Sequence, residues 1–159
     1  MDWGTLASTA TGGLIGVVST LSAEWFRTRR DRESTDHADR RRLYGEYLAA
    51  LSHTRSELRA TARDTAASAE ERARRALDSF HTGGAYELRY QVAITAPESV
   101  VAASTEAFRA LRDMRDLLHT GALRTDPAYA ASRDRWEDAF AELRARIRCD
   151  LVRPPRRRG

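Results

Sequence analysis

Side chains that could bind a metal or move a proton are few in this chain and lie far apart. The four histidines stand in separate segments, and none has a second His or a Cys at the spacing of a zinc site: His37, His53, His81 and His119. The sequence contains no P-loop, no H-E-x-x-H helix and no G-x-S-x-G or G-x-G-x-x-G motif. We therefore expect no metal, no cofactor and no catalytic residue, and we predict that the protein is not an enzyme.

Two pairs of neighbouring carboxylates could in principle hold a metal or act as an acid–base pair, namely Glu70 with Glu71 and Asp113 with Asp116. Each pair has arginines within four positions on the same expected helix, so we interpret both pairs as solvated ion-pair faces. The single cysteine, Cys149, excludes an internal disulfide and a Cys-based zinc cluster, and we interpret it as incidental.

The composition suits one domain with a buried core, since the chain has 159 residues, of which 42% are hydrophobic and 31% charged. All 27 basic residues are Arg, and the 23 acids leave a net charge of +4. The exclusive use of Arg, together with abundant Ala, looks like the codon usage of a GC-rich genome rather than selection for phosphate contacts. The arginines alternate with acids along the chain, so nucleic acid is not the favoured partner.

The N-terminal segment, residues 3–23, carries no charge. As a helix these 21 residues would span about 31 Å, close to the ~30 Å hydrocarbon core of a bilayer. Aromatic residues at both ends would form an interfacial belt, and a cluster of arginines follows directly. By the positive-inside rule, the N-terminus lies outside and the bulk of the chain in the cytoplasm, as in a single-pass protein of the inner membrane. The belt is Trp3, Trp25 and Phe26, and the cluster is Arg27, Arg29, Arg30 and Arg32.

Three other interpretations of this segment stay open. A cleavable signal peptide would need a positively charged start, and residues 1–3 supply no basic side chain. A buried helix of a soluble domain would carry its polar residues on one face, whereas the Ser, Thr and Gly of this segment lie all round the helix. A helix lying in the membrane interface would carry Arg on its polar face, and none occurs before Arg27.

Small residues recur at every fourth position of the predicted span, and they include one true G-x-x-x-G pair. Such a face lets a second helix approach closely, so we expect the chain to form a homo-oligomer through it. Gly and Ser are frequent throughout the segment, and the alternative is a span that tolerates them without self-association. The face is Gly4, Ser8, Gly12, Gly16 and Thr20.

Apolar residues at helical spacing predict four further helices, roughly 36–64, 68–94, 96–119 and 126–152. Ser68 with Glu71 is a capping-box pattern that opens the second of these, and Thr95 with Glu98 offers the same device for the third, with Pro97 in its first turn. The segment 85–94 alternates apolar and polar residues as a strand does, but no second segment alternates in this way to pair with it. We therefore predict a helix there, continuing beyond a disturbance at residues 83–84, and a strand paired across a dimer is the alternative.

Short connections would make neighbouring helices antiparallel, so the last helix would return to the end at which the first begins. The predicted fold is all-α: one N-terminal transmembrane helix followed by an antiparallel bundle of about four helices. Its parts are an anchor (1–26), an arginine-rich neck (27–35), the cytoplasmic bundle (36–152) and a basic tail (153–159). Like the neck, the tail is expected to contact anionic lipid headgroups, with a solvated tail as the alternative. The tail residues concerned are Arg156, Arg157 and Arg158.

Three short stretches carry a resemblance: residues 42–50 (RLYGEYLAA), 96–103 (APESVVAA) and 140–144 (FAELR). With the Gly-rich N-terminal segment and the arginine-rich neck, they resemble a loose group of actinobacterial single-pass membrane proteins. The resemblance implies a membrane-tethered helical domain and carries neither an activity nor catalytic residues. It also implies an uninterrupted helix across Gly83 and Gly84, from which this sequence departs.

These features together predict a non-enzymatic, membrane-anchored helical scaffold that acts through contacts with a protein or with anionic lipid. The helix 43–62 or the segment 85–94 would present the surface for an unidentified protein partner. Two other functions stay open. One is a small oligomeric pore of the holin type, whose Ser and Thr side chains would face water. The other is a soluble arginine-rich helical regulator that binds DNA.

Overall fold

The computed structural model describes residues 36–152, and its first helix covers residues 36–63. Four further helices follow it: α2 (Ala69–Thr82), α3 (Ala85–Thr95), α4 (Glu98–His119) and α5 (Pro127–Val152). The chain divides into two compact units, Met1–Asp39 and Arg40–Gly159, and the helical bundle belongs to the second unit. Within the described residues there is no strand, which confirms the predicted all-α class for this part of the chain.

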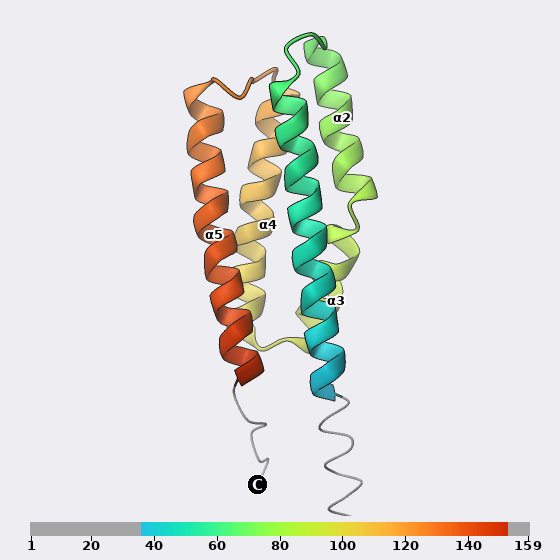
Figure 1. The fold of residues 1–159 in the computed structure, drawn as a ribbon, viewed down its shortest axis with the longest axis vertical. Coiled ribbons are helices and arrows are strands. Elements are labelled where there is room, and N and C mark those ends of the chain that lie inside the picture. The colour runs from blue at the N-terminus through green and yellow to red at the C-terminus, as the bar shows by residue number, and fades with distance from the viewer. Residues whose placement is uncertain (1–35, 153–159) are drawn as a thin grey trace, which may run out of the picture. The chain divides into compact units, whose positions relative to one another are not determined.

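The helices form an up-and-down bundle in which α2 and α3 together take the place of one predicted helix (Figure 1). Because the connections 64–68, 96–97 and 120–126 are short, the first helix, the pair α2 and α3, α4 and α5 run antiparallel in turn, and α3 continues in the general direction of α2. The last helix consequently returns to the end at which the first begins, as predicted. There the hydroxyl of Tyr44 donates to Oδ2 of Asp150 at 2.7 Å, and Nη1 of Arg40 lies 3.5 Å from the same oxygen. We call this the chain-end side of the bundle, and the opposite side, with the connections 64–68 and 120–126, the distal side.

The core consists of the apolar faces that the helical spacing predicts. In the centre the hydroxyls of Tyr47 and Ser104 share a buried hydrogen bond of 2.8 Å, which satisfies both groups without water. The side chains with no more than 1% exposure include Tyr44, Tyr47, Leu51, Leu58, Ala62, Val100, Ala107, Leu111, Met114, Leu118 and Leu143.

A break at Gly83 and Gly84 separates α2 from α3, so the helix 68–94, predicted with a disturbance at these two residues, is two helices. Gly84 has a left-handed backbone, with φ +66°, which ends one helix and redirects the next. Gly83 lies against the first helix: a Cβ at this position would overlap Oγ1 of Thr54 and come within 2.8 Å of the Ser79 carbonyl oxygen. The segment 85–94 is helical, as predicted, and not a strand.

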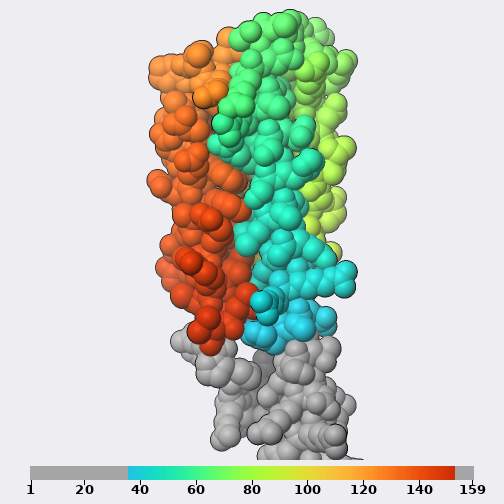
Figure 2. Space-filling model, in the orientation of Figure 1, coloured from blue at the N-terminus to red at the C-terminus, as the bar shows by residue number. Residues whose placement is uncertain are grey.

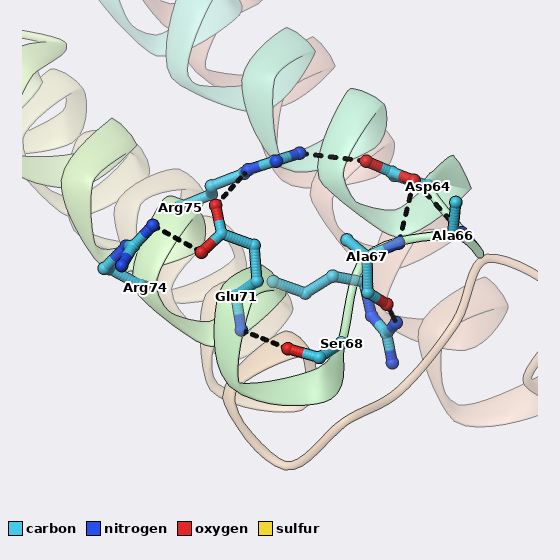
Figure 3. A network of polar contacts seen from close by, with 8 residues as sticks. Asp64, Ala66, Ala67, Ser68, Glu71, Arg74 and Arg75 are labelled. Carbon is cyan, nitrogen blue, oxygen red and sulfur yellow. Dashed lines mark hydrogen bonds and ion pairs between the residues drawn. The ribbon is translucent and has the colours of Figure 1, made fainter.

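The connection 64–68 is held by a polar network that also starts α2 (Figure 3). Oδ1 of Asp64 accepts two amide hydrogens of the loop at 3.1 Å each, and Oδ2 pairs with Arg75 at 2.9 Å. Oγ of Ser68 accepts the amide of Glu71 at 3.1 Å, which confirms one half of the predicted capping box. The other half is not formed, because the Glu71 carboxylate pairs with the arginines of its own helix, Arg74 and Arg75.

The predicted cap at the start of α4 is wrong. Pro97 is the residue before the helix rather than part of its first turn, and no side chain caps the helix. Oγ1 of Thr95 instead donates to the Gln91 carbonyl at 2.8 Å, so this hydroxyl belongs to the end of α3.

Of the helices in the described part of the chain, none is long and apolar enough to cross a bilayer. The predicted span, residues 3–23, lies outside the described residues.

Candidate functional site

The functional residues that the sequence predicts lie outside residues 36–152, so they stay predictions. They are the small-residue face (Gly4, Ser8, Gly12, Gly16 and Thr20), the belt (Trp3, Trp25 and Phe26) and the headgroup contacts (Arg27, Arg29, Arg30, Arg32, Arg156, Arg157 and Arg158).

Three of the four carboxylates in these two pairs form ion pairs with arginines. Glu71 pairs with Arg74 and Arg75, and Asp116 with Arg115 at 2.6 Å, on their own helices as predicted, whereas Asp113 lies 3.5 Å from Arg135 of α5. Between residues 36 and 152 no group of three His, Cys, Asp or Glu side chains could hold a metal ion. Cys149 is exposed and free.

An arginine-rich pocket, which sequence reasoning missed, lies along the seam between the first helix and α5, which run side by side in Figure 2. It occupies the distal half of the bundle, because its residues come from the later turns of the first helix, the connection 120–126 and the first turns of α5. Its volume of about 190 Å³ lies below the ~300–1,000 Å³ of sites for drug-sized ligands. The lining residues of this arginine pocket are Arg55, Arg59, Arg124, Tyr129, Arg133 and Glu137.

Two of the four lining arginines have an acidic neighbour. Nη2 of Arg55 lies 3.4 Å from Oε1 of Glu137, and Nη2 of Arg133 lies 2.7 Å from Oδ1 of Asp134. Arg55 is the most deeply placed of the four. Its side chain is 13% exposed, its guanidinium carbon lies 5.3 Å above the ring of Trp136, and its buried Nε has no hydrogen-bond partner. This nitrogen is a donor that the protein itself leaves unsatisfied.

The other two lining arginines, Arg59 and Arg124, are exposed and pair with no carboxylate among residues 36–152. Arg63, one turn beyond Arg59, is in the same situation. Elsewhere on the bundle, some arginines pair with an acid one turn away, as Arg42 does with Glu46 at 2.8 Å, and others, such as Arg41 and Arg112, have no carboxylate partner among residues 36–152. The distal seam therefore concentrates positive charge that the described part of the chain does not neutralise.

Electrostatic effects on neighbouring groups show the same concentration of charge. Repulsion by Arg59, together with partial burial and the charges of Arg124 and Arg55, lowers the pKa of Arg63. Burial raises the pKa of Tyr129. The charges that act in the opposite direction and lower it are those of the four lining arginines, Arg55, Arg59, Arg124 and Arg133. Arg59, Arg124 and Arg55 are thus close enough to disfavour the positive charge of Arg63.

Backbone contacts hold the cluster in place. The amide of Arg124 donates to the Ala62 carbonyl at 3.0 Å, which ties the connection 120–126 to the end of the first helix. Oδ2 of Asp126 accepts the Leu123 amide at 2.7 Å, so the loop is braced just before α5 begins. The hydroxyl of Tyr129 lies 3.5 Å from the Leu58 carbonyl and fixes the first turn of α5 against the first helix.

A signal for this pocket was present in the sequence. Arg55, Arg59 and Arg63 follow one another at intervals of four, so they share one helix face. None of the positions three or four residues away from any of them carries an acid. Their meeting with Arg124 and Arg133 depends on the antiparallel packing of α5, which spacing alone does not give.

A second unassigned feature is the outer face of α3. Tyr86, Tyr90 and Ile94 lie at intervals of four and are 49%, 54% and 83% exposed. The two tyrosine rings meet edge to face at 5.2 Å between centroids, and the Tyr90 hydroxyl donates to that of Tyr86 at 3.1 Å. Of the two predicted partner surfaces, only this one keeps its apolar side chains exposed, because those of the helix 43–62 form the core.

The chain matches no protein-family model, no curated protein and no solved structure. The resemblance to actinobacterial single-pass proteins therefore stays a prediction.

Proposed function

We propose that this protein is a non-enzymatic, membrane-anchored helical scaffold that contacts a protein or anionic lipid and self-associates through its N-terminal segment. The observation that carries the proposal is that the first helix begins and α5 ends at the same side of the bundle. Asp150 contacts Tyr44 at 2.7 Å, so the sequence that precedes the bundle and the tail that follows it join the bundle at the same side.

This arrangement suits a bundle held by one span, because the arginine-rich neck and the basic tail are then joined to the side that meets the membrane. One anchor combined with a polybasic patch gives stable membrane association, and each arginine near an anionic surface contributes about 1 kcal/mol. The apolar outer face of α3 supports the protein-contact part of the proposal, since its three large side chains, Tyr86, Tyr90 and Ile94, are 49%, 54% and 83% exposed.

Membrane extraction tests the anchor. We expect the full chain to remain in the membrane pellet after alkaline carbonate treatment, and a chain that begins at Arg27 to be released, because the apolar segment supplies the insertion energy. Release of the full chain would contradict the anchor.

Vesicle binding by residues 34–159 tests the tail separately. Replacing the three tail arginines by Gln should weaken binding to vesicles rich in phosphatidylglycerol by about 3 kcal/mol, or roughly 150-fold. A control chain loses the same charge from the body of the bundle and should bind nearly as well as the unchanged one. Equal losses in the two chains would contradict a specific role of the tail. The tail variant carries R156Q, R157Q and R158Q, and the control R109Q, R112Q and R135Q.

A further inference from the structure

We propose that the arginine pocket binds a compact phosphate-bearing anion with two linked phosphate groups, such as pyrophosphate or the diphosphate end of a nucleotide. The four lining arginines, Arg55, Arg59, Arg124 and Arg133, would bind the anion, and Arg63, one turn beyond Arg59 and outside the lining, would add its charge. The juxtaposition of these five side chains on three segments of the bundle carries the inference.

The presence of arginine does not by itself indicate a phosphate site, because every basic residue of the chain is Arg. Nine of the arginines among residues 36–152 have no carboxylate partner in that part of the chain, and three of these nine, Arg59, Arg63 and Arg124, meet at this one seam. Arg55 and Arg133, which join them there, are each paired once. Three positive charges are therefore left to be neutralised. A single phosphate group carries a charge of about −1.5 to −2, so two linked groups match the cluster better than one.

The geometry favours a small ligand over an extended one. Arginine presents its donors in a planar fork that suits phosphate oxygens bidentately, and the braced loop holds Arg124 before any ligand arrives. The pocket volume of about 190 Å³ accommodates a charged group rather than a whole drug-sized molecule. A nucleic acid backbone would need a continuous positive stripe, but outside the pocket many arginines of the described surface are paired with acids, such as Arg42 with Glu46.

The position of the pocket points to a ligand from solution. Arg59 follows Arg40 by 19 positions on the same helix, or about 28 Å along its axis. If the chain-end side faces a membrane, as the proposed function has it, headgroups at that surface do not reach the pocket. Binding of the anion does not require the membrane anchor. The chain could therefore fail the carbonate test and still bind pyrophosphate, or pass that test and not bind it.

The test uses the full chain in an uncharged detergent at constant ionic strength, with pyrophosphate as the probe in a calorimetric titration. We expect pyrophosphate to bind at least about tenfold more tightly than orthophosphate, a difference of about 1.4 kcal/mol. Arg59→Gln and Arg124→Gln should each weaken pyrophosphate binding about tenfold, since each removes one unpaired guanidinium. The matched control is Arg148→Gln, which removes the same charge from an exposed position about 22 Å along α5 from Arg133 and should bind as the unchanged chain does.

A second readout uses Trp136, whose ring lies under the Arg55 guanidinium at 5.3 Å. In a chain with Trp3→Phe and Trp25→Phe, pyrophosphate should change the Trp136 emission as Arg55 turns toward the anion. A third readout is stability without ligand: because the arginines repel one another, Arg59→Gln should raise the melting temperature.

Three results would overturn the proposal. One is equal affinity for pyrophosphate and orthophosphate, and another is an equal loss of affinity in the Arg148→Gln control. The third is tighter, strongly salt-dependent binding of duplex DNA that pyrophosphate does not displace, which would identify the arginines as part of a nucleic-acid surface. A lower melting temperature of ligand-free Arg59→Gln would assign this residue a structural role and count against the proposal as well.

Discussion

The hydroxyl of Tyr44 joins the first helix to the end of α5, and its removal gives a sharp test of the convergent chain ends. Tyr44 is 1% exposed and donates to Oδ2 of Asp150 at 2.7 Å. Burial, with the hydrogen bond to Asp150 as the second cause, raises the pKa of Tyr44, so the hydroxyl keeps its proton at neutral pH. Asp150 itself lies in the last turn of α5, where a negative charge opposes the helix dipole unless a donor compensates it.

Tyr44→Phe keeps the buried ring and removes only this donor. A hydrogen bond to a charged group contributes about 1.5–3 kcal/mol, and we expect the free energy of unfolding of residues 34–159 to fall by that amount. At about 4 °C per kcal/mol the melting temperature would fall by roughly 6–12 °C. Circular dichroism at pH 7 follows both experiments: urea unfolding measures the free energy, and thermal unfolding measures the melting temperature. The control is Tyr86→Phe. Tyr86 is 49% exposed, and removal of its hydroxyl should lower the free energy of unfolding by less than about 0.5 kcal/mol.

A double-mutant cycle separates the contact from other effects of the substitution. In an Asp150→Ala chain the acceptor is already gone, so adding Tyr44→Phe should cost little, with a coupling energy of about 1.5–3 kcal/mol. If Tyr44→Phe alone unfolds at the same urea concentration as the unchanged chain, or if its cost persists without Asp150, the assignment of this contact as the closure of the bundle is refuted.

Two further predictions concern close packing and alkaline pH. Gly83→Ala should lower the free energy of unfolding by about 1–3 kcal/mol, because its Cβ would overlap Thr54, whereas Gly45→Ala, in an open helical position, should raise it by about 0.5–1 kcal/mol. Urea unfolding of both chains checks the pair, and equal stabilities would contradict it. Burial raises the pKa of Tyr47 and of Tyr129, so the folded chain keeps protons that the unfolded chain loses above pH ~10. Each tyrosine contributes its stability in full below pH ~10. Above that pH, each should lower the free energy of unfolding by about 1.4 kcal/mol per pH unit, until the pH passes the pKa of the folded state. Unfolding measured between pH 9 and 11 tests this slope, and a flat profile in that range would argue against it.

Helical periodicity predicted most of the fold because each long helix buries one face. The positions of Tyr47, Leu111 and Leu143 follow from that rule, and all three are fully buried. Within α3 the rule gave an ambiguous pattern, since apolar side chains line its outer face as well as its inner one. Val92 is buried while Ile94 is 83% exposed, and two such faces together produce the alternation of a strand.

The side-chain contacts at the helix ends were harder to predict, because each depends on which neighbouring group binds the side chain. The Glu71 carboxylate could bond back to the amide of the capping residue, but two arginines of its own helix pair with it instead. Likewise the hydroxyl of Thr95 reaches a carbonyl in the preceding turn and is lost to the next helix. Both outcomes depend on competition within a few ångströms, which spacing rules do not weigh.

The arginine pocket escaped sequence reasoning for a different reason. Its part from the first helix, Arg55 and Arg59, is local and continues the same helix face as Arg63; this face was visible in the sequence as arginines without acids one turn away. The other part, with Arg124 and Arg133, reaches that face only because α5 packs against the first helix in the antiparallel sense. A long-range juxtaposition of like charges costs stability, and no propensity or pattern would predict it, since a sequence under selection for the fold alone tends to avoid such repulsion.

The same two helices make both ends of the bundle distinct. On the chain-end side the first helix and α5 meet through opposite charges, Arg40 and Asp150, which draw them together. On the distal side both helices bring arginines to one pocket, Arg59 from the first helix and Arg133 from α5, and Tyr129 and the Arg124 amide tie the seam together. The proposed anion would bind arginines of both helices there and add an attraction to that between Arg40 and Asp150 on the other side. If both proposals hold, binding of the anion strengthens the contact between the first helix and α5 at the distal side, while the anchor is joined to the opposite side of the same two helices. This needs no change of fold.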